Sequence, residues 1–134
     1  MIDIESDVFK KISTALRAKY TNMFVTGEYV KAPSSFPAVS IVEADNYMNV
    51  QTQSAEGLEN HVVLMYEVNA YSNKKTGKKS ECKDIISIID DEFLAMGFTR
   101  TMLANIQNYE DSTIYRMTAR YRAVVSKENV IYRR

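Results

Sequence analysis

The feature that most constrains the fold of this chain is an alternating stretch in its middle, residues 61–71. Successive side chains of a strand point to opposite faces of a sheet, so alternate positions share a face. One face is apolar throughout: Val62, Leu64, Tyr66, Val68 and Ala70. The other mixes apolar and polar side chains: His61, Val63, Met65, Glu67 and Asn69. The stretch predicts a strand with one face in the core, and its half-apolar second face indicates that this side is covered too.

Two amphipathic helices are predicted, one before and one after this strand. Residues 3–20 have apolar side chains at helical spacing, with Asp3 as the expected cap and acidic residues preceding basic ones, which suits the helix dipole. Residues 80–96 form the second helix, with Ser80 as the expected cap and Gly97 as the residue that ends it. Its expected buried stripe is Cys82, Ile85, Ile86, Ile89, Phe93 and Leu94.

Further strands are predicted over residues 23–26, 38–44, 98–108, 113–125 and 130–132. The order helix, strands, helix, strands predicts a single α+β domain over residues 1–134. We expect a mixed or antiparallel sheet of about four to six strands with two helices packed on one face. Residues 46–60 are polar, contain Gly57 and lack helical periodicity, so they predict a flexible arm between two strands.

Composition is that of one globular domain, with 134 residues, 46% of them hydrophobic and 25% charged. The single cysteine excludes an intramolecular disulfide and a four-cysteine zinc site. A secretory signal is not expected, because the first residues show no charged segment followed by an apolar one, and no apolar run approaches the ~18 residues that span a membrane. A reducing, cytosolic setting is therefore expected.

Charge is balanced overall, with 17 basic and 17 acidic residues, which argues against bulk nucleic-acid affinity. Its distribution is uneven, because residues 32–73 contain no lysine or arginine, whereas basic residues dominate after Ser112. Two interpretations stay open: solvated faces that balance within the fold, or an acidic and a basic flank that favour head-to-tail self-association. Under the second, the expected subunit-interface residues are Glu43, Asp45, Glu56, Glu59, Val63, Met65, Arg116, Arg120 and Arg122.

Candidate catalytic and ligand-binding residues are few. Cys82 lies on the apolar stripe of a helix, where a core role is expected, and His61 is the only histidine. Gly77-Lys78 lies between a strand and a helix, but Ser72 and Lys79 occupy the places where a phosphate-binding loop needs glycine and a hydroxyl. Asp90, Asp91 and Glu92 are adjacent on a helix, so they point in different directions and suit its solvated side. We expect no enzyme activity, no metal and no cofactor.

The arginine row of residues 113–125 has two open interpretations. Arg116, Arg120 and Arg122 share one strand face, which is either a solvated sheet surface or a basic surface that meets the acidic segment of a neighbouring copy. A basic surface could also line a passage for DNA without reading its sequence. Tyr115 and Tyr121 point to the opposite face, so base stacking on the arginine face is not expected.

The order of these parts resembles the tail terminator, or tail-to-head joining (tail completion), proteins of long-tailed phages and prophages. The resemblance rests on an amphipathic first helix, the string Ser35-Phe36-Pro37-Ala38-Val39-Ser40-Ile41, a polar arm, the strand at His61-Val62-Val63-Leu64-Met65-Tyr66-Glu67-Val68, a helix with Ile85, Ile86 and Ile89, and closing strands that end near Tyr121-Arg122-Ala123-Val124-Val125. It covers most of the chain and brings no catalytic motif with it.

This resemblance implies a virion protein that assembles in the host cytoplasm at the head-proximal end of the tail. Copies form a ring, commonly a hexamer, that sits on the last ring of tail-tube protein, stops its polymerisation and offers a surface to the head connector or stopper protein. DNA passes through such a ring without sequence-specific contacts. Two alternatives remain: another head–tail connector component, such as a head-completion or stopper protein, and a small ligand-binding α+β domain.

Overall fold

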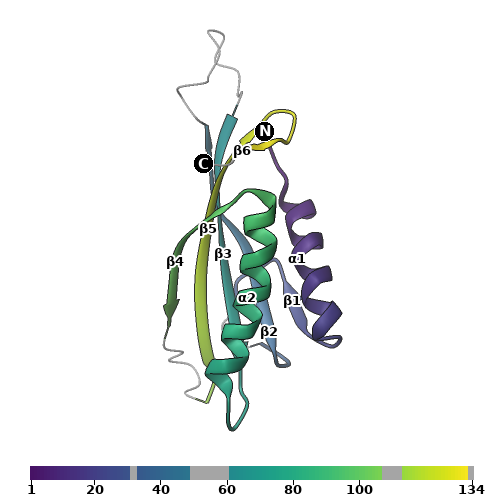
Figure 1. Cartoon of the computed structure of the whole chain (residues 1–134), viewed down its shortest axis with the longest axis vertical. Coiled ribbons are helices and arrows are strands. Elements are labelled where there is room, and N and C mark those ends of the chain that lie inside the picture. Colours follow the sequence, from purple (N-terminus) through teal and green to yellow (C-terminus); the bar gives the residue numbers. More distant parts are fainter. Residues whose placement is uncertain (31–32, 49–60, 107–112, 133–134) are drawn as a thin grey trace.

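The computed structural model describes residues 1–30, 33–48, 61–106 and 113–132. Two helices and six strands follow one another as α1 (Glu5–Lys19), β1 (Phe24–Thr26), β2 (Ala38–Met48), β3 (His61–Ser72), α2 (Lys78–Met96), β4 (Thr99–Asn105), β5 (Tyr115–Ser126) and β6 (Ile131–Tyr132). The strands form one mixed sheet in the order β1-β2-β3-β5-β4, with β6 beside β5. Among the strand pairs of the described residues, only β1 and β2 run parallel; the other pairs are antiparallel. The predicted α+β class is confirmed (Figure 1).

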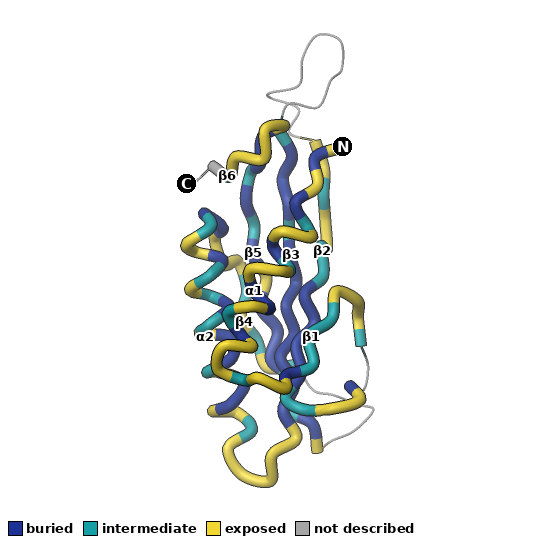
Figure 2. Tube along the Cα trace, turned by 90° about the vertical axis from the view of Figure 1, so that its right-hand side faces the viewer, coloured by how far each residue is buried: buried dark blue, intermediate teal, exposed yellow. Residues whose placement is uncertain are grey.

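Strands β3 and β5 form the centre of the sheet, and their register confirms the two faces that alternation predicts. Tyr66 pairs with Tyr121 and Val68 with Ala119, so the apolar faces of both strands lie on the same side. All four of these side chains are fully buried. Figure 2 shows the two strands buried along most of their length. Burial of this apolar face from water is the main favourable term that holds the sheet to its helices.

Both helices cover this apolar face, as the sequence predicts (Figure 1). The stripe of α1 contributes Val8, Ile12 and Leu16 to the core, and α2 contributes the expected stripe with one exception. Leu94 is 45% exposed. It follows Phe93 directly, so its side chain points about 100° away from that of Phe93 around the helix axis. The two helices are joined where Asp84 accepts hydrogen bonds from Lys19 Nζ at 2.8 Å and the Tyr20 hydroxyl at 2.6 Å, and these bonds lower the pKa of Asp84.

The helix ends differ in detail from the predicted caps. Helix α2 begins at Lys78 after Gly77, whose φ of 83° lies in the left-handed region, so Ser80 is inside the first turn and the predicted cap is wrong. At the other end Gly97 has a φ of 105° and ends the helix as predicted. Asp3 lies one residue before the cap position of α1, where its carboxylate still accepts the N–H of Glu5 at 2.9 Å.

The two edges of the sheet are protected against further strand pairing in different ways. Beyond the short pairing with β1, the outer edge of β2 lies against the beginning of the chain: the Glu43 backbone N–H donates to the Glu5 carboxylate at 3.4 Å, and the Asn46 side-chain amide donates to the Ile2 carbonyl at 2.9 Å. The opposite edge is β4, where the pairing with β5 shifts between Arg100 and Met102. Such a bulge twists an edge strand and disfavours added strands.

Two predicted boundaries need correction. β2 continues to Met48 rather than ending at residue 44, because residues 45–48 pair with β3 after a bulge at Glu43/Asp45. The first three residues of the predicted arm therefore belong to a strand, and residues 49–60 lie outside the described residues, as do Glu56 and Glu59. The predicted strand over residues 98–108 is described only as Thr99–Asn105. No helix among the described residues is long and apolar enough to cross a membrane.

Candidate functional site on the open face of the sheet

The face of the sheet that points away from both helices, here called the open face, brings together most of the predicted interface residues. It divides into two halves along the strands. The covered half consists of Ser40, Glu67, Asn69, Tyr71, Arg116, Thr118 and Arg120; the bare half consists of Asp45, Tyr47, Val63, Met65, Arg122 and Val124.

The covered half lies beneath the segment that follows β1, residues 27–30, here called the strap. The Tyr71 hydroxyl donates to the Val30 carbonyl at 2.9 Å. Burial, together with the charge of Glu67 and a hydrogen bond to it, raises the pKa of Tyr29. Near the same end, Phe24 and Phe36 pack against a second small core of Ala38, Tyr71 and Ile114. The cover that the half-apolar second face predicts is therefore present on this half.

A hydrogen-bonded network fills the covered half beneath the strap. The Asn69 side chain is fully buried, and its carbonyl oxygen accepts from Arg116 Nε at 2.9 Å and from the Thr118 hydroxyl at 2.6 Å. Its amide donates to the Ser40 hydroxyl at 3.3 Å and to Glu67 at 3.4 Å. Buried polar groups need such partners, because an unpaired one loses its hydration without compensation.

An ion pair completes this network and corrects the charge interpretation. Arg120 and Glu67 are direct partners in the β3–β5 register, and their side chains form an ion pair at 3.0 Å. The basic end of the chain and its acidic middle thus meet inside one subunit. The prediction that acidic and basic flanks lie apart is wrong at this pair, and Arg116 and Arg120 are engaged within the subunit.

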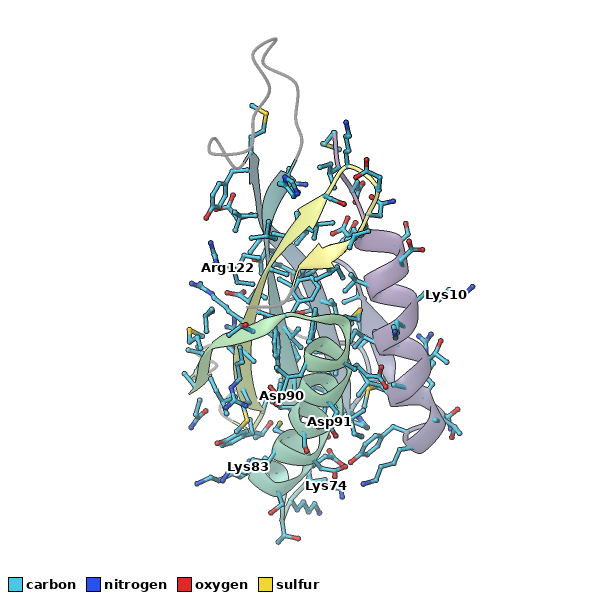
Figure 3. The ribbon with its side chains drawn as sticks, turned by 45° about the horizontal axis from the view of Figure 1, so that its top comes forward. Lys10, Lys74, Lys83, Asp90, Asp91 and Arg122 are labelled. Atoms are coloured by element: carbon cyan, nitrogen blue, oxygen red, sulfur yellow. The ribbon has the colours of Figure 1, made fainter. Side chains whose placement is uncertain are left out.

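The bare half of the open face carries side chains with fewer partners. Asp45, Met65 and Arg122 stand side by side on β2, β3 and β5, and Arg122 points away from the helices in Figure 3. Within the described part of the chain, neither Asp45 nor Arg122 forms an ion pair. Beside this row Tyr47 is 48% exposed, whereas its register partner Val63 is only 4% exposed.

Sequence reasoning missed two members of the bare half and one contact of the covered half. Tyr47 was hidden within the predicted arm, although its alternation with Asp45 is compatible with a strand. Val124 is the register partner of Val63, which only the pairing of β3 with β5 reveals. Tyr29 lies in the strap, where no periodic pattern marks it.

Glu43 lies on the helix side of the sheet, apart from the other predicted interface residues. Its carboxylate, with those of Asp3 and Glu5, forms a group whose oxygens lie within 4.8 Å of one another. Burial, followed by the charges of Glu5 and Asp3, raises the pKa of Glu43, although a hydrogen bond from the Tyr66 hydroxyl at 3.3 Å opposes this. Carboxylates are the ligands that hard cations take, so this is a place among the described residues where a cation could be held.

Replacing Glu43 by Gln tests this charge crowding. A carboxyl whose pKa is raised by folding binds its proton more tightly in the folded state than in the unfolded state. Its ionised form therefore lowers the free energy of unfolding at pH values above the folded-state pKa. This loss disappears at pH values below the unfolded-state pKa. Glu43→Gln keeps an oxygen for Tyr66 and is expected to raise stability at pH 7 by under about 1 kcal/mol, because the group is partly solvated. Thermal melts should show the gain shrinking toward about pH 4. A gain independent of pH would contradict the explanation.

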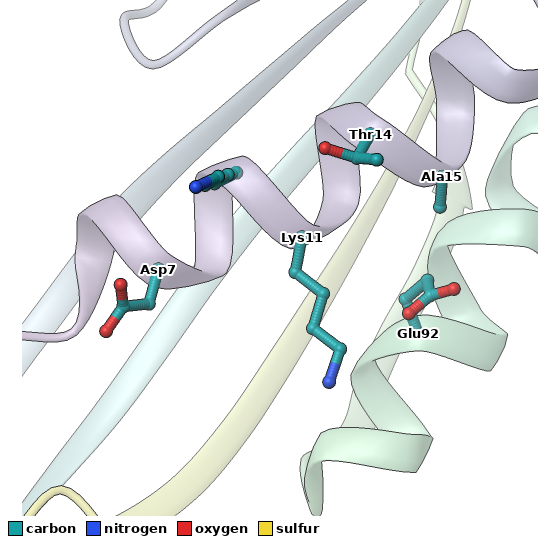
Figure 4. A pocket seen from close by; sticks show the side chains of 6 residues that line it. Asp7, Lys11, Thr14, Ala15 and Glu92 are labelled. Carbon is teal, nitrogen blue, oxygen red and sulfur yellow. The ribbon is translucent and has the colours of Figure 1, made fainter.

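The described residues on the helix side line open grooves. One groove of about 420 Å³ lies between the helices and is lined by Asp7, Lys10, Lys11, Thr14, Ala15 and Glu92. Figure 4 shows Lys11 of α1 and Glu92 of α2 reaching into the space between the helices. This groove is open to solvent, whereas small-molecule sites are typically clefts that bury most of the ligand.

The other candidate residues have structural partners. Burial raises the pKa of the Cys82 thiol to about 12, which disfavours the reactive thiolate. At the start of α2, Glu81 accepts from the Ser72 hydroxyl at 2.7 Å and pairs with Lys74 at 3.2 Å, so a carboxylate already occupies the region where an anion would bind. Asp90 was expected on a solvated side but accepts from the Tyr121 hydroxyl at 2.9 Å and pairs with Arg100 at 3.1 Å.

Comparison with known proteins adds no family assignment. No protein-family model matches this chain, and no curated protein matches it.

Proposed function

We propose that this chain is a structural subunit of the phage tail terminator type, whose copies form a ring that caps the tail tube, ends its polymerisation and offers a docking surface to the head. One observation carries the proposal: on one half of the open face, Asp45 and Arg122 form no ion pair with another described residue, and Tyr47 is 48% exposed. Surfaces of this kind on small domains are sites of protein association.

Two further features support the proposal. The order of elements, an amphipathic helix, two long strands, a second helix and closing strands, is the order on which the resemblance to tail terminators rests. Two residues that could act in catalysis or metal binding have structural roles instead: Cys82 is buried in the core, and Asp90 accepts a hydrogen bond from the Tyr121 hydroxyl.

The proposal is tested by adding the purified chain to tail-tube protein of the same phage during polymerisation. We expect tubes to stop growing in the presence of the chain, and negative-stain images to show a ring at one tube end. Tubes of unchanged length without a terminal ring would overturn the proposal.

Deletion of the gene separates this function from other neck proteins. Loss of a terminator is expected to produce overlong tails, because nothing then ends polymerisation. Tails of normal length beside leaking, unjoined heads would instead assign the chain to head completion and overturn the terminator proposal.

A further inference from the structure

The turn between β3 and α2, together with the first turns of α2, forms a basic surface. Lys75, Lys79 and Lys83 are exposed and form no ion pair with another described residue. Lys79 and Lys83 are four residues apart on α2, so they project from the same side of the helix. Lys75 precedes them in the turn, which lies at the lower end of the molecule in Figure 1, and Lys83 points outward at this end in Figure 3. These three lysines are here called the basic end.

Carboxylates gather on a different part of the subunit, around an open groove of about 460 Å³. The groove lies between the first turns of α1 and the start of the strap, and Glu5, Phe9 and Glu28 are among the residues that line it. Neither Glu5 nor Glu28 forms an ion pair with another described residue. Figure 2 looks onto this side of the molecule, where α1 and β1 lie. The groove is here called the acidic groove.

The acidic groove has the chemistry that binds a lysine side chain. The ring of Phe9 is only partly buried, so the methylene stem of a lysine can lie against it, and the carboxylates of Glu5 and Glu28 can accept its ammonium group. Burial and the nearby charges of Glu5 and Asp3 raise the pKa of Glu43, which lies beside the groove. A cation brought to this place would relieve a repulsion that the subunit itself leaves in place.

The basic end and the acidic groove lie apart within one subunit. Helix α1 begins toward the upper end of the molecule in Figure 1, whereas the turn before α2 lies at the lower end. A contact between the two surfaces therefore joins two copies through two different patches, which is a heterologous contact. Each copy that binds in this way still has one surface free, so the contact repeats from copy to copy until a ring closes.

We propose that the basic end of one copy binds in the acidic groove of the next copy and thereby joins neighbouring subunits head to tail. The inference rests on the proposed ring, because it names the contact through which its subunits join. The partner is a second copy of this chain, since the same subunit carries both charges and leaves both without an ion pair among the described residues.

Charge reversal on either side tests the contact. Sedimentation of the wild-type chain in low salt should show species heavier than the monomer of 15.3 kDa, and added salt should dissociate them, because it screens exposed charges. The basic-end variant, Lys75→Glu with Lys79→Glu, should associate on the order of 100-fold more weakly, because it brings like charges together. The groove variant, Glu5→Lys with Glu28→Lys, should lose association to the same extent.

Matched controls make the same changes of charge at exposed residues outside the contact. Lys11→Glu with Lys127→Glu is the control for the basic-end variant, and Asp91→Lys with Glu128→Lys is the control for the groove variant. Both controls should associate like the wild type. Equal losses in a variant and its control would show that net charge, rather than this contact, governs association, and would overturn the inference.

Mixing the two variants removes misfolding as an explanation. Each should be monomeric alone, but together they should associate, since the reversed basic end of one then meets the reversed groove of the other. A wild-type chain that is monomeric at all concentrations, or association that salt does not weaken, would overturn the inference. A basic-end variant that self-associates normally but no longer binds the tube would also overturn it and assign the basic end to the tube protein.

Carbodiimide cross-linking locates the contact in the wild-type chain, because it joins a lysine amine only to a carboxylate that touches it. Mass spectrometry should find links between Lys75 or Lys79 and Glu5 or Glu28. Because these groups lie apart in one subunit, such links join two copies. Links between copies that involve only other residues would overturn the inference.

The two proposals can fail separately. A chain that associates through the basic end but does not stop tube growth leaves the contact standing and overturns the terminator function. A chain that caps tubes, and whose basic-end variant caps them equally well, does the reverse.

Discussion

Replacement of Phe93 by alanine is expected to lower the free energy of unfolding by about 3–5 kcal/mol, the largest effect of any single truncation proposed for this chain. Phe93 is fully buried and stacks on Tyr121 with ring centroids 4.3 Å apart. Its ring centroid also lies 5.8 Å from that of Tyr66, in a tilted arrangement, and 5.1 Å from that of Phe98, in an edge-to-face arrangement. The variant loses apolar burial and these ring contacts, and it leaves a cavity between α2 and the sheet. Urea unfolding followed by circular dichroism measures the loss.

Leu94→Ala is the matched control, because Leu94 is the next residue of the same helix and is 45% exposed. Its truncation should change stability by no more than about 0.5 kcal/mol. Equal losses for the two variants would show that the aromatic cluster is not the source of the effect.

Arg120→Glu is expected to lower the free energy of unfolding by about 2–3 kcal/mol and to weaken the fold itself. The Glu67 side chain is only 11% exposed, and Arg120 is its cationic partner at 3.0 Å. Reversal leaves two carboxylates in register on β3 and β5 and a nearly buried charge without compensation. The loss is smaller than for a fully buried pair, because the Arg120 side chain is 45% exposed.

Arg122→Glu, two residues along the same strand and face, is the control for this experiment. It has no ion pair with another described residue, so its reversal should change the stability of the single subunit by no more than about 0.5 kcal/mol. Denaturant unfolding at low protein concentration, where copies do not associate, compares the two. A stable Arg120→Glu variant would show that the ion pair contributes little.

Periodicity was sufficient to predict most of the fold. The alternation of Tyr66 and Val68 with Glu67 determines which face of β3 enters the core, and the helical spacing of Ile85, Ile89 and Phe93 determines the buried stripe of α2. Each prediction follows from the side-chain periodicity of a strand or a helix alone, without knowledge of the elements that pack against it.

Pairing across the sheet was beyond the reach of sequence patterns. Glu67 and Arg120 are 53 residues apart, so their neutralisation depends on β5, rather than β4, lying beside β3. Charge counts along the chain suggested two flanks, and the antiparallel register brings the flanks together. The candidate site was therefore only partly predictable. The sequence analysis named Asp45, Met65 and Arg122, but it did not predict that they lie side by side on three neighbouring strands.

The treatment of the two sheet edges has a consequence for crowded conditions. On one side, the Glu5 carboxylate accepts the backbone N–H of Glu43 and the Asp45 carboxylate accepts that of Asn46; on the other, the bulge near Met102 distorts the edge. Ribbon-like growth, in which each molecule extends its neighbour's sheet, is disfavoured at both borders. Contacts between copies at high concentration are thereby directed to side chains rather than to the backbone.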